Sequence, residues 1–128
     1  MAGIAVTAIY IGGVIHLLTA VFHLFFWRLF NWPEELAKLS PLNARVVPVM
    51  NISLIVGFLG AAYVSVSFAG DLVGTALGRG VSFALALFWL ARLIQQFIFF
   101  GLRKPFSWFL SLACLLLAVI YSLPLFAV

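Results

Sequence analysis

Apolar residues fall into four long runs along the chain, and most charged residues lie in the three connections between them. The runs are Ile4–Trp27, Val46–Phe68, Gly80–Gly101 and Phe106–Val128. A helix needs about 20 apolar residues to cross a hydrocarbon layer roughly 30 Å thick, and each run has this length. The pattern predicts an all-α, polytopic membrane protein, with residues 1–128 forming a single bundle of four transmembrane helices.

The connection between the first two runs predicts a short interfacial helix. Pro33 suits the first turn of a helix, and the carboxylates of Glu34 and Glu35 favour its positive end. Glu34 and Lys38 are spaced for an ion pair four residues apart. We expect this helix to lie at the membrane surface as a lid or an anchor.

Prolines and glycines indicate where the other spans begin and how they pack. Pro48 and Pro105 are expected in the first turns of the second and fourth spans, where a missing N–H costs little. The glycine-rich stretch 69–80 predicts a plain external loop. Gly57 and Ala61 form a pair of small residues four apart, which is either a contact for a neighbouring helix or a chance pattern.

The composition supports a membrane protein and indicates its orientation. Only 8% of residues are charged, whereas about a quarter are charged in a typical soluble domain. Because basic residues are enriched in cytoplasmic loops, we expect the first and third connections in the cytoplasm and the N- and C-termini outside. The scattered cations argue against a nucleic-acid surface. The basic residues of the first and third connections are Arg28, Lys38, Arg45, Arg103 and Lys104, against Arg79 alone in the second.

Six polar side chains inside the spans are the candidate ligand-binding residues. At about 1.5 Å per residue, four of them lie about 6–9 Å from the cytoplasmic ends of the spans, and two lie nearer the midplane. Such groups are expensive to expose to lipid, so we expect them to face the bundle interior and form one polar cavity. The six are His16, His23, Asn51, Arg92, Gln95 and Gln96.

Arg92 is the most informative of these residues. A guanidinium does not lose its proton in a protein, and the only acidic residues, Glu34, Glu35 and Asp71, lie in the connections. The sequence therefore predicts that Arg92 interacts with neutral acceptors, with an anion, or with an acidic group of another chain. The alternative for the whole polar set is structural: histidine, asparagine and glutamine also serve as hydrogen bonds between transmembrane helices.

Several kinds of chemistry are disfavoured. His16 and His23 lie about 10 Å apart along one helix and cannot bind a single zinc ion together. The spans hold no carboxylate for a proton-coupled pump, and no catalytic residue can be named. Haem ligation by His16 or His23 stays open, as does recognition of a quinone.

Two segments resemble small, uncharacterised bacterial membrane proteins with four predicted helices. They are HLFFWRLFNW at residues 23–32 and LFWLARLIQQ at residues 87–96. The resemblance covers the first and third spans, implies a place in the bacterial inner (plasma) membrane, and implies no activity.

Three functions remain open from the sequence. The first is a membrane protein whose polar cavity binds a small apolar or anionic ligand, lipid-like or quinone-like, with Arg92 as its anchor. The second is an accessory subunit of a larger membrane complex or a homo-oligomer, in which a partner's acidic residue pairs with Arg92. The third is a haem-dependent redox or lipid-modifying enzyme.

Overall fold

The computed structural model describes residues 1–127, and all the regular structure in this part of the chain is helical. Four helices are long and apolar enough to cross a membrane, as the sequence predicts. Val128, the last residue of the fourth predicted span, lies outside the described residues. The elements are α1 (Ala2–Leu24), α2 (Phe26–Leu29), α3 (Trp32–Glu35), η1 (Leu36–Lys38), α4 (Pro41–Ser67), α5 (Ala69–Gly74), α6 (Ala76–Gln95), η2 (Gln96–Phe100) and α7 (Pro105–Phe126).

Two long helices begin earlier than the apolar runs because hydroxyl side chains cap them. Ser40 Oγ accepts a hydrogen bond from the amide of Asn43 at 3.3 Å, so α4 begins at Pro41 and Pro48 lies inside the helix. The expectation that Pro48 starts the second span is therefore wrong. Thr75 Oγ1 caps α6 in the same way, accepting from the amide of Gly78 at 2.9 Å. Capping side chains satisfy amides that have no partner within the helix.

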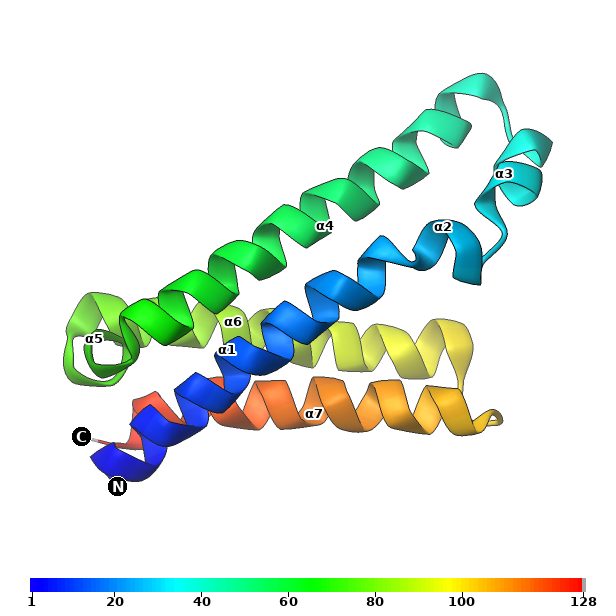
Figure 1. The fold of residues 1–128 in the computed structure, drawn as a ribbon. Coiled ribbons are helices and arrows are strands. Elements are labelled where there is room, and N and C mark those ends of the chain that lie inside the picture. The colour runs from blue at the N-terminus through cyan, green and yellow to red at the C-terminus, as the bar shows by residue number, and fades with distance from the viewer. Residues whose placement is uncertain (128) are drawn as a thin grey trace.

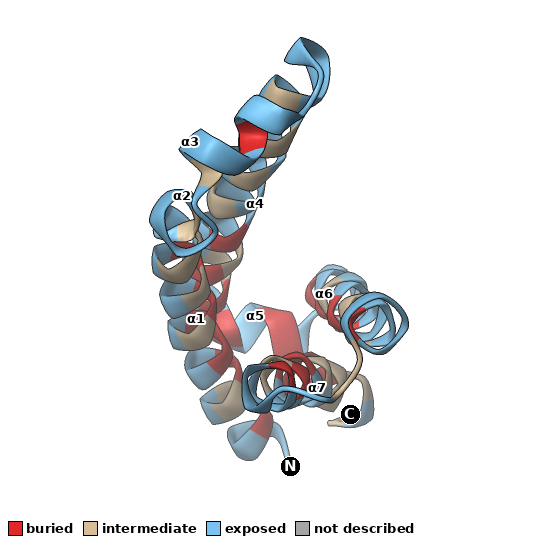
Figure 2. Ribbon diagram, turned by 90° about the vertical axis from the view of Figure 1, so that its right-hand side faces the viewer, coloured by how far each residue is buried: buried red, intermediate tan, exposed pale blue. Residues whose placement is uncertain are grey.

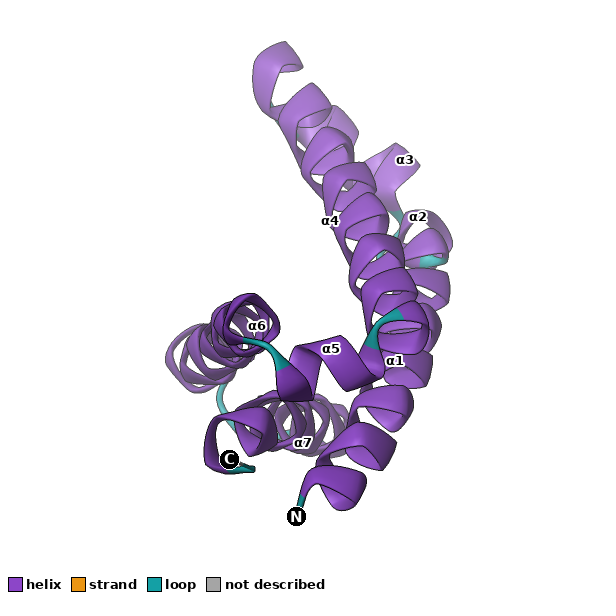
Figure 3. Ribbon diagram, turned by 90° about the vertical axis from the view of Figure 1, so that its left-hand side faces the viewer, coloured by secondary structure: helices purple, strands orange, loops and turns teal. Residues whose placement is uncertain are grey.

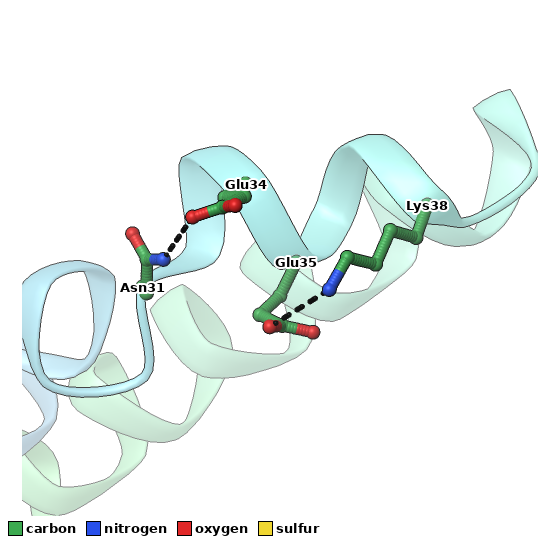
Figure 4. Close-up of polar contacts among 4 residues, drawn as sticks. All are labelled: Asn31, Glu34, Glu35 and Lys38. Carbon is green, nitrogen blue, oxygen red and sulfur yellow. Dashed lines mark hydrogen bonds and ion pairs between the residues drawn. The ribbon is translucent and has the colours of Figure 1, made fainter.

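The segment between α1 and α4 is helical, but its polar contacts differ from the prediction. Asn31 has φ 50°, a left-handed conformation that asparagine tolerates, and its Nδ2 donates to Glu34 Oε2 at 2.6 Å. Lys38 pairs with Glu35 at 3.2 Å, three residues away, rather than with Glu34 (Figure 4). The tighter turn of η1 brings residues three apart onto one side of the segment, which favours this pairing.

The glycine-rich connection after α4 is also not a plain loop. Residues 69–74 form α5, which buries Ala69, Leu72 and Val73 against the long helices. A Cβ atom at Gly78 would lie 1.9 Å from the backbone oxygen of Asp71. Glycine at this position therefore permits α6 to pack closely against the backbone of α5. The sequence pattern did not indicate this contact.

The long helices form two antiparallel hairpins, α1 with α4 and α6 with α7 (Figures 1 and 3). No Cα atom of α4 lies within 8 Å of a Cα atom in α6 or α7; α5 and the crossing of α1 over α7 join the hairpins. The hairpins are close together at the end that holds α5 and both termini, and they diverge toward the end that holds α2 and α3 (Figure 1).

Buried residues concentrate where the hairpins meet, and the outward surfaces are largely apolar and exposed (Figure 2). Two glycines of α1 permit close packing there. A Cβ atom at Gly12 would lie 2.9 Å from the hydroxyl of Tyr121, and one at Gly13 would lie 2.9 Å from Val66 Cγ2. Gly57, by contrast, has nothing within 4 Å of such an atom, so the hypothesis that it marks a helix contact is wrong for residues 1–127.

Candidate functional site

One hydrogen-bonded chain joins all four long helices at the junction of the hairpins. The indole Nε1 of Trp89 on α6 donates to His16 Nε2 on α1 at 3.0 Å. His16 Nδ1 lies 3.0 Å from the hydroxyl of Tyr121 on α7, which lies 2.5 Å from Ser65 Oγ on α4. All four side chains are buried, and His16 is only 1% exposed. This series of hydrogen bonds therefore links both hairpins through buried side chains that lipid and water do not reach.

The direction of these hydrogen bonds determines which ring nitrogen of His16 carries the proton. An indole N–H can only donate, so His16 Nε2 must be the unprotonated acceptor. The proton of the neutral ring is then on Nδ1, which faces both the carbonyl of Gly12 at 3.0 Å and the hydroxyl of Tyr121. Both ring nitrogens are engaged with protein groups. An iron ion at His16 would have to displace either Trp89 or these acceptors.

Phe58 closes the gap between α4 and α6 at the same level. Its ring stacks on Trp89 with centroids 5.6 Å apart and planes 17° apart. It also lies 6.1 Å from the ring of His16 and 5.0 Å from the ring of His23. Phe58 of α4 also meets the ring of Phe88 on α6, with centroids 6.2 Å apart, so it contacts two aromatic side chains of that helix.

A second level, a layer of mostly polar side chains, lies seven residues away from the first layer along each of the four helices. Seven residues make about two helical turns, or about 10.5 Å, and in the antiparallel hairpins each step leads away from α5. His16, Phe58, Trp89 and Tyr121 thus have counterparts at His23, Asn51, Gln96 and Cys114. The second level falls where the hairpins diverge.

His23 and Asn51 lie together at the end of α1. The regular helix ends at Leu24, where the last carbonyls have no partner within the helix, and Asn51 Nδ2 donates to the backbone oxygen of His23 at 3.0 Å. The imidazole of His23 hydrogen-bonds the carbonyl of Thr19 through Nδ1 at 2.8 Å and stacks on Phe26 with centroids 4.2 Å apart. The side-chain oxygen of Asn51, Oδ1, is buried and has no hydrogen-bond partner in residues 1–127.

Arg92 lies between the two levels and has no ionic partner. Its guanidinium carbon is 5.7 Å from the ring centroid of Phe100. Nη1 is buried and makes no hydrogen bond within residues 1–127. An unpaired buried donor costs about 1–3 kcal/mol, and more when it is charged, so this nitrogen identifies a position where an acceptor is needed.

The two glutamines of α6 have different surroundings. Gln95 is exposed, whereas Gln96 is 1% exposed, and its Oε1 has no donor among the described residues. The helix widens into the π-helical turn η2 at Gln96, where the amide of Gly101 bonds its carbonyl at 3.0 Å. Single π-helical turns occur often at functional sites.

The structure thus brings some of the predicted residues together and separates others. Arg92 and Gln96 share one face of α6 with Trp89, which contacts His16 of α1, whereas His23 and Asn51 lie together on the α1–α4 hairpin. His16 belongs to the buried chain one level away, and Gln95 is exposed. Sequence reasoning missed the structural role of Phe58, although the seven-residue step from Asn51 would have indicated it.

Two concave surfaces on the described residues differ in size and position. His23 and Asn51 border a pocket of about 200 Å³ on the α1–α4 hairpin, and Arg92 does not contribute to it. A shallower depression of about 550 Å³ lies along the first turns of α1 and holds none of the predicted residues. The remaining residues of the smaller pocket are Leu24, Trp27, Trp32, Pro48, Ile52 and Ile55.

No group of three or more histidine, cysteine or acidic side chains within residues 1–127 is arranged to hold a metal ion. No protein-family model, curated protein or solved structure matches the chain. The geometry is therefore the basis for assigning a function.

Proposed function

We propose that this chain is a multi-pass protein of the bacterial inner membrane that binds a small amphipathic ligand between its two hairpins. The first and third connections face the cytoplasm, both termini face outside, and α3 with η1 lies at the cytoplasmic surface. The four long helices form one bundle in the membrane, as in the small bacterial four-helix membrane proteins that the first and third spans resemble.

The buried, unpartnered Nη1 of Arg92 is the observation that carries this proposal. A guanidinium keeps its charge at any physiological pH, and a charge at this depth needs an acceptor. The chain supplies no acid: the one ion pair among the described residues is Lys38 with Glu35, in the segment between α1 and α4. An anionic or carbonyl group of a ligand would satisfy this nitrogen.

The surroundings of Arg92 suit an amphipathic molecule. Phe100 provides apolar surface, with its ring centroid 5.7 Å from the guanidinium carbon, and Gln96, one turn along the same face of α6, provides a hydrogen-bonding group. In this proposal His16 holds the helices in place through Trp89 and Tyr121, and does not touch the ligand.

The test compares the small molecules that co-purify with the wild-type protein in lipid nanodiscs and with two variants. Arg92→Met removes the proposed anchor. Arg103→Met makes the same chemical change at an exposed position in the connection before α7. We expect one lipid-like or quinone-like molecule to be enriched in the wild type and in Arg103→Met, and to be lost from Arg92→Met.

An accessory subunit is the competing function, because a partner's carboxylate would satisfy Arg92 equally well. That function requires a second protein in fixed proportion, lost from Arg92→Met, with no small molecule enriched. A haem enzyme requires a visible absorption band in the purified protein. Either result would contradict the proposed ligand.

A further inference from the structure

Gln96 needs a different kind of partner from Arg92. The amide oxygen Oε1 can only accept a hydrogen bond, and it has no donor within residues 1–127 although the residue is 1% exposed. A phosphate or carboxylate oxygen can satisfy Arg92 but cannot donate to Gln96. A ligand that carries only an anionic group would leave this oxygen unpaired.

The two side chains are close enough to meet a single ligand head. They are four residues apart on α6, which places their Cβ atoms about 5–6 Å apart on the same face. Trp89, three residues before Arg92 on this face, donates to His16 of α1 at 3.0 Å, so the face is directed toward α1. A head that reaches both must present an acceptor and a donor separated by a few bonds.

We infer, on the basis of the proposed function, that the ligand head is an anionic group with a neighbouring hydroxyl, such as a glycerol phosphodiester. A phosphate oxygen accepts from Nη1 of Arg92, and a glycerol hydroxyl donates to Oε1 of Gln96. A lipid headgroup and a soluble glycerol phosphate share this chemistry.

Two lipids of equal charge, only one of which has head hydroxyls, provide the test. Phosphatidylglycerol and phosphatidylmethanol are both singly charged phosphodiesters, and only the first carries head hydroxyls. Each is incorporated as a minor component of phosphatidylcholine nanodiscs, and native mass spectrometry measures the lipid that the released wild-type protein retains. We expect about threefold to tenfold more retained phosphatidylglycerol, the effect of one net hydrogen bond.

Variants assign the preference to one residue. Gln96→Leu should retain the two lipids equally, while Gln95→Leu, the same change at the exposed neighbour, should keep the preference. Soluble glycerol phosphate is added as a competitor: displacement of the lipid indicates a soluble source of the same head, and no displacement indicates a membrane lipid. Both results support the hydroxyl-bearing head.

The comparison of the two lipids on the wild-type protein decides whether the ligand head carries a hydroxyl. Equal retention of the two lipids, lost in Arg92→Met, would overturn the hydroxyl-bearing head and leave the proposed function standing. Retention of neither lipid, together with no displacement of any co-purifying molecule by glycerol phosphate, would also overturn it. Absence of any co-purifying molecule would overturn the proposed function itself.

Discussion

Trp89→Phe removes a single hydrogen-bond donor from the chain that joins the four helices. The indole Nε1 donates to His16 Nε2 at 3.0 Å in the wild type. A phenyl ring at this position keeps an aromatic surface against Phe58, whose ring stacks on the indole at 5.6 Å. The substitution therefore leaves a buried nitrogen of His16 without a donor. It also shortens a buried ring, and the double variant described below separates these two effects.

The expected loss of stability follows from the free energies measured for buried hydrogen bonds in soluble proteins and between membrane helices. Leaving a buried acceptor unpaired costs about 1–3 kcal/mol in soluble proteins, and hydrogen bonds between membrane helices average about 0.6 and reach about 1.7 kcal/mol. We expect the free energy of unfolding to fall by about 1–2 kcal/mol, or about fivefold to thirtyfold in the folding equilibrium.

The assay is reversible unfolding in mixed micelles with increasing sodium dodecyl sulfate. Trp108→Phe is the matched control, because Trp108 on α7 is 53% exposed, and it should lose little stability. The double variant of Trp89→Phe with His16→Leu should lose less than the sum of the single changes, since removing both partners leaves no unpaired group. Equal losses in Trp89→Phe and Trp108→Phe, with an additive double variant, would refute this reasoning.

Three further substitutions test the packing in the same unfolding assay. Tyr121→Phe removes the hydroxyl shared by two buried partners and should lower the free energy of unfolding by about 1–2 kcal/mol; no loss would show that the hydroxyl is not needed. Gly13→Ala places a methyl group 2.9 Å from α4 and should lose about 1–3 kcal/mol, whereas Gly57→Ala, with nothing within 4 Å, should lose none. Gly78→Ala meets the backbone of α5 and should lose more than Gly80→Ala, which faces open space; equal effects would contradict the close approach of α5 and α6.

The four long helices could be predicted from the sequence because hydrophobic length alone determines them. The shorter features depend on contacts that a hydrophobic pattern does not contain. The helix α4 begins directly after Ser40, whose side chain caps it, and Pro48 therefore lies within the helix and not at its start. The helix α5 forms among glycines because Leu72 and Val73 are buried against neighbouring helices, and such tertiary contacts override local propensity.

The candidate site was predictable only in part, for a similar reason. Arg92 and Gln96 could be identified from one helix, since a charge and an amide deep in a span both need partners. The role of His16 depends on Trp89 and Tyr121, which lie 73 and 105 residues away along the chain. Periodicity places each residue on a helix face, but it does not say which faces meet.

The intact mass of the protein released from nanodiscs tests the proposed role of Arg92 most directly, because it counts bound molecules on each chain. The wild type and Arg103→Met should each carry one additional small mass, and Arg92→Met should appear as the bare chain. A bare wild-type chain, or a wild-type chain found only in fixed proportion with another protein, would contradict a ligand on Arg92.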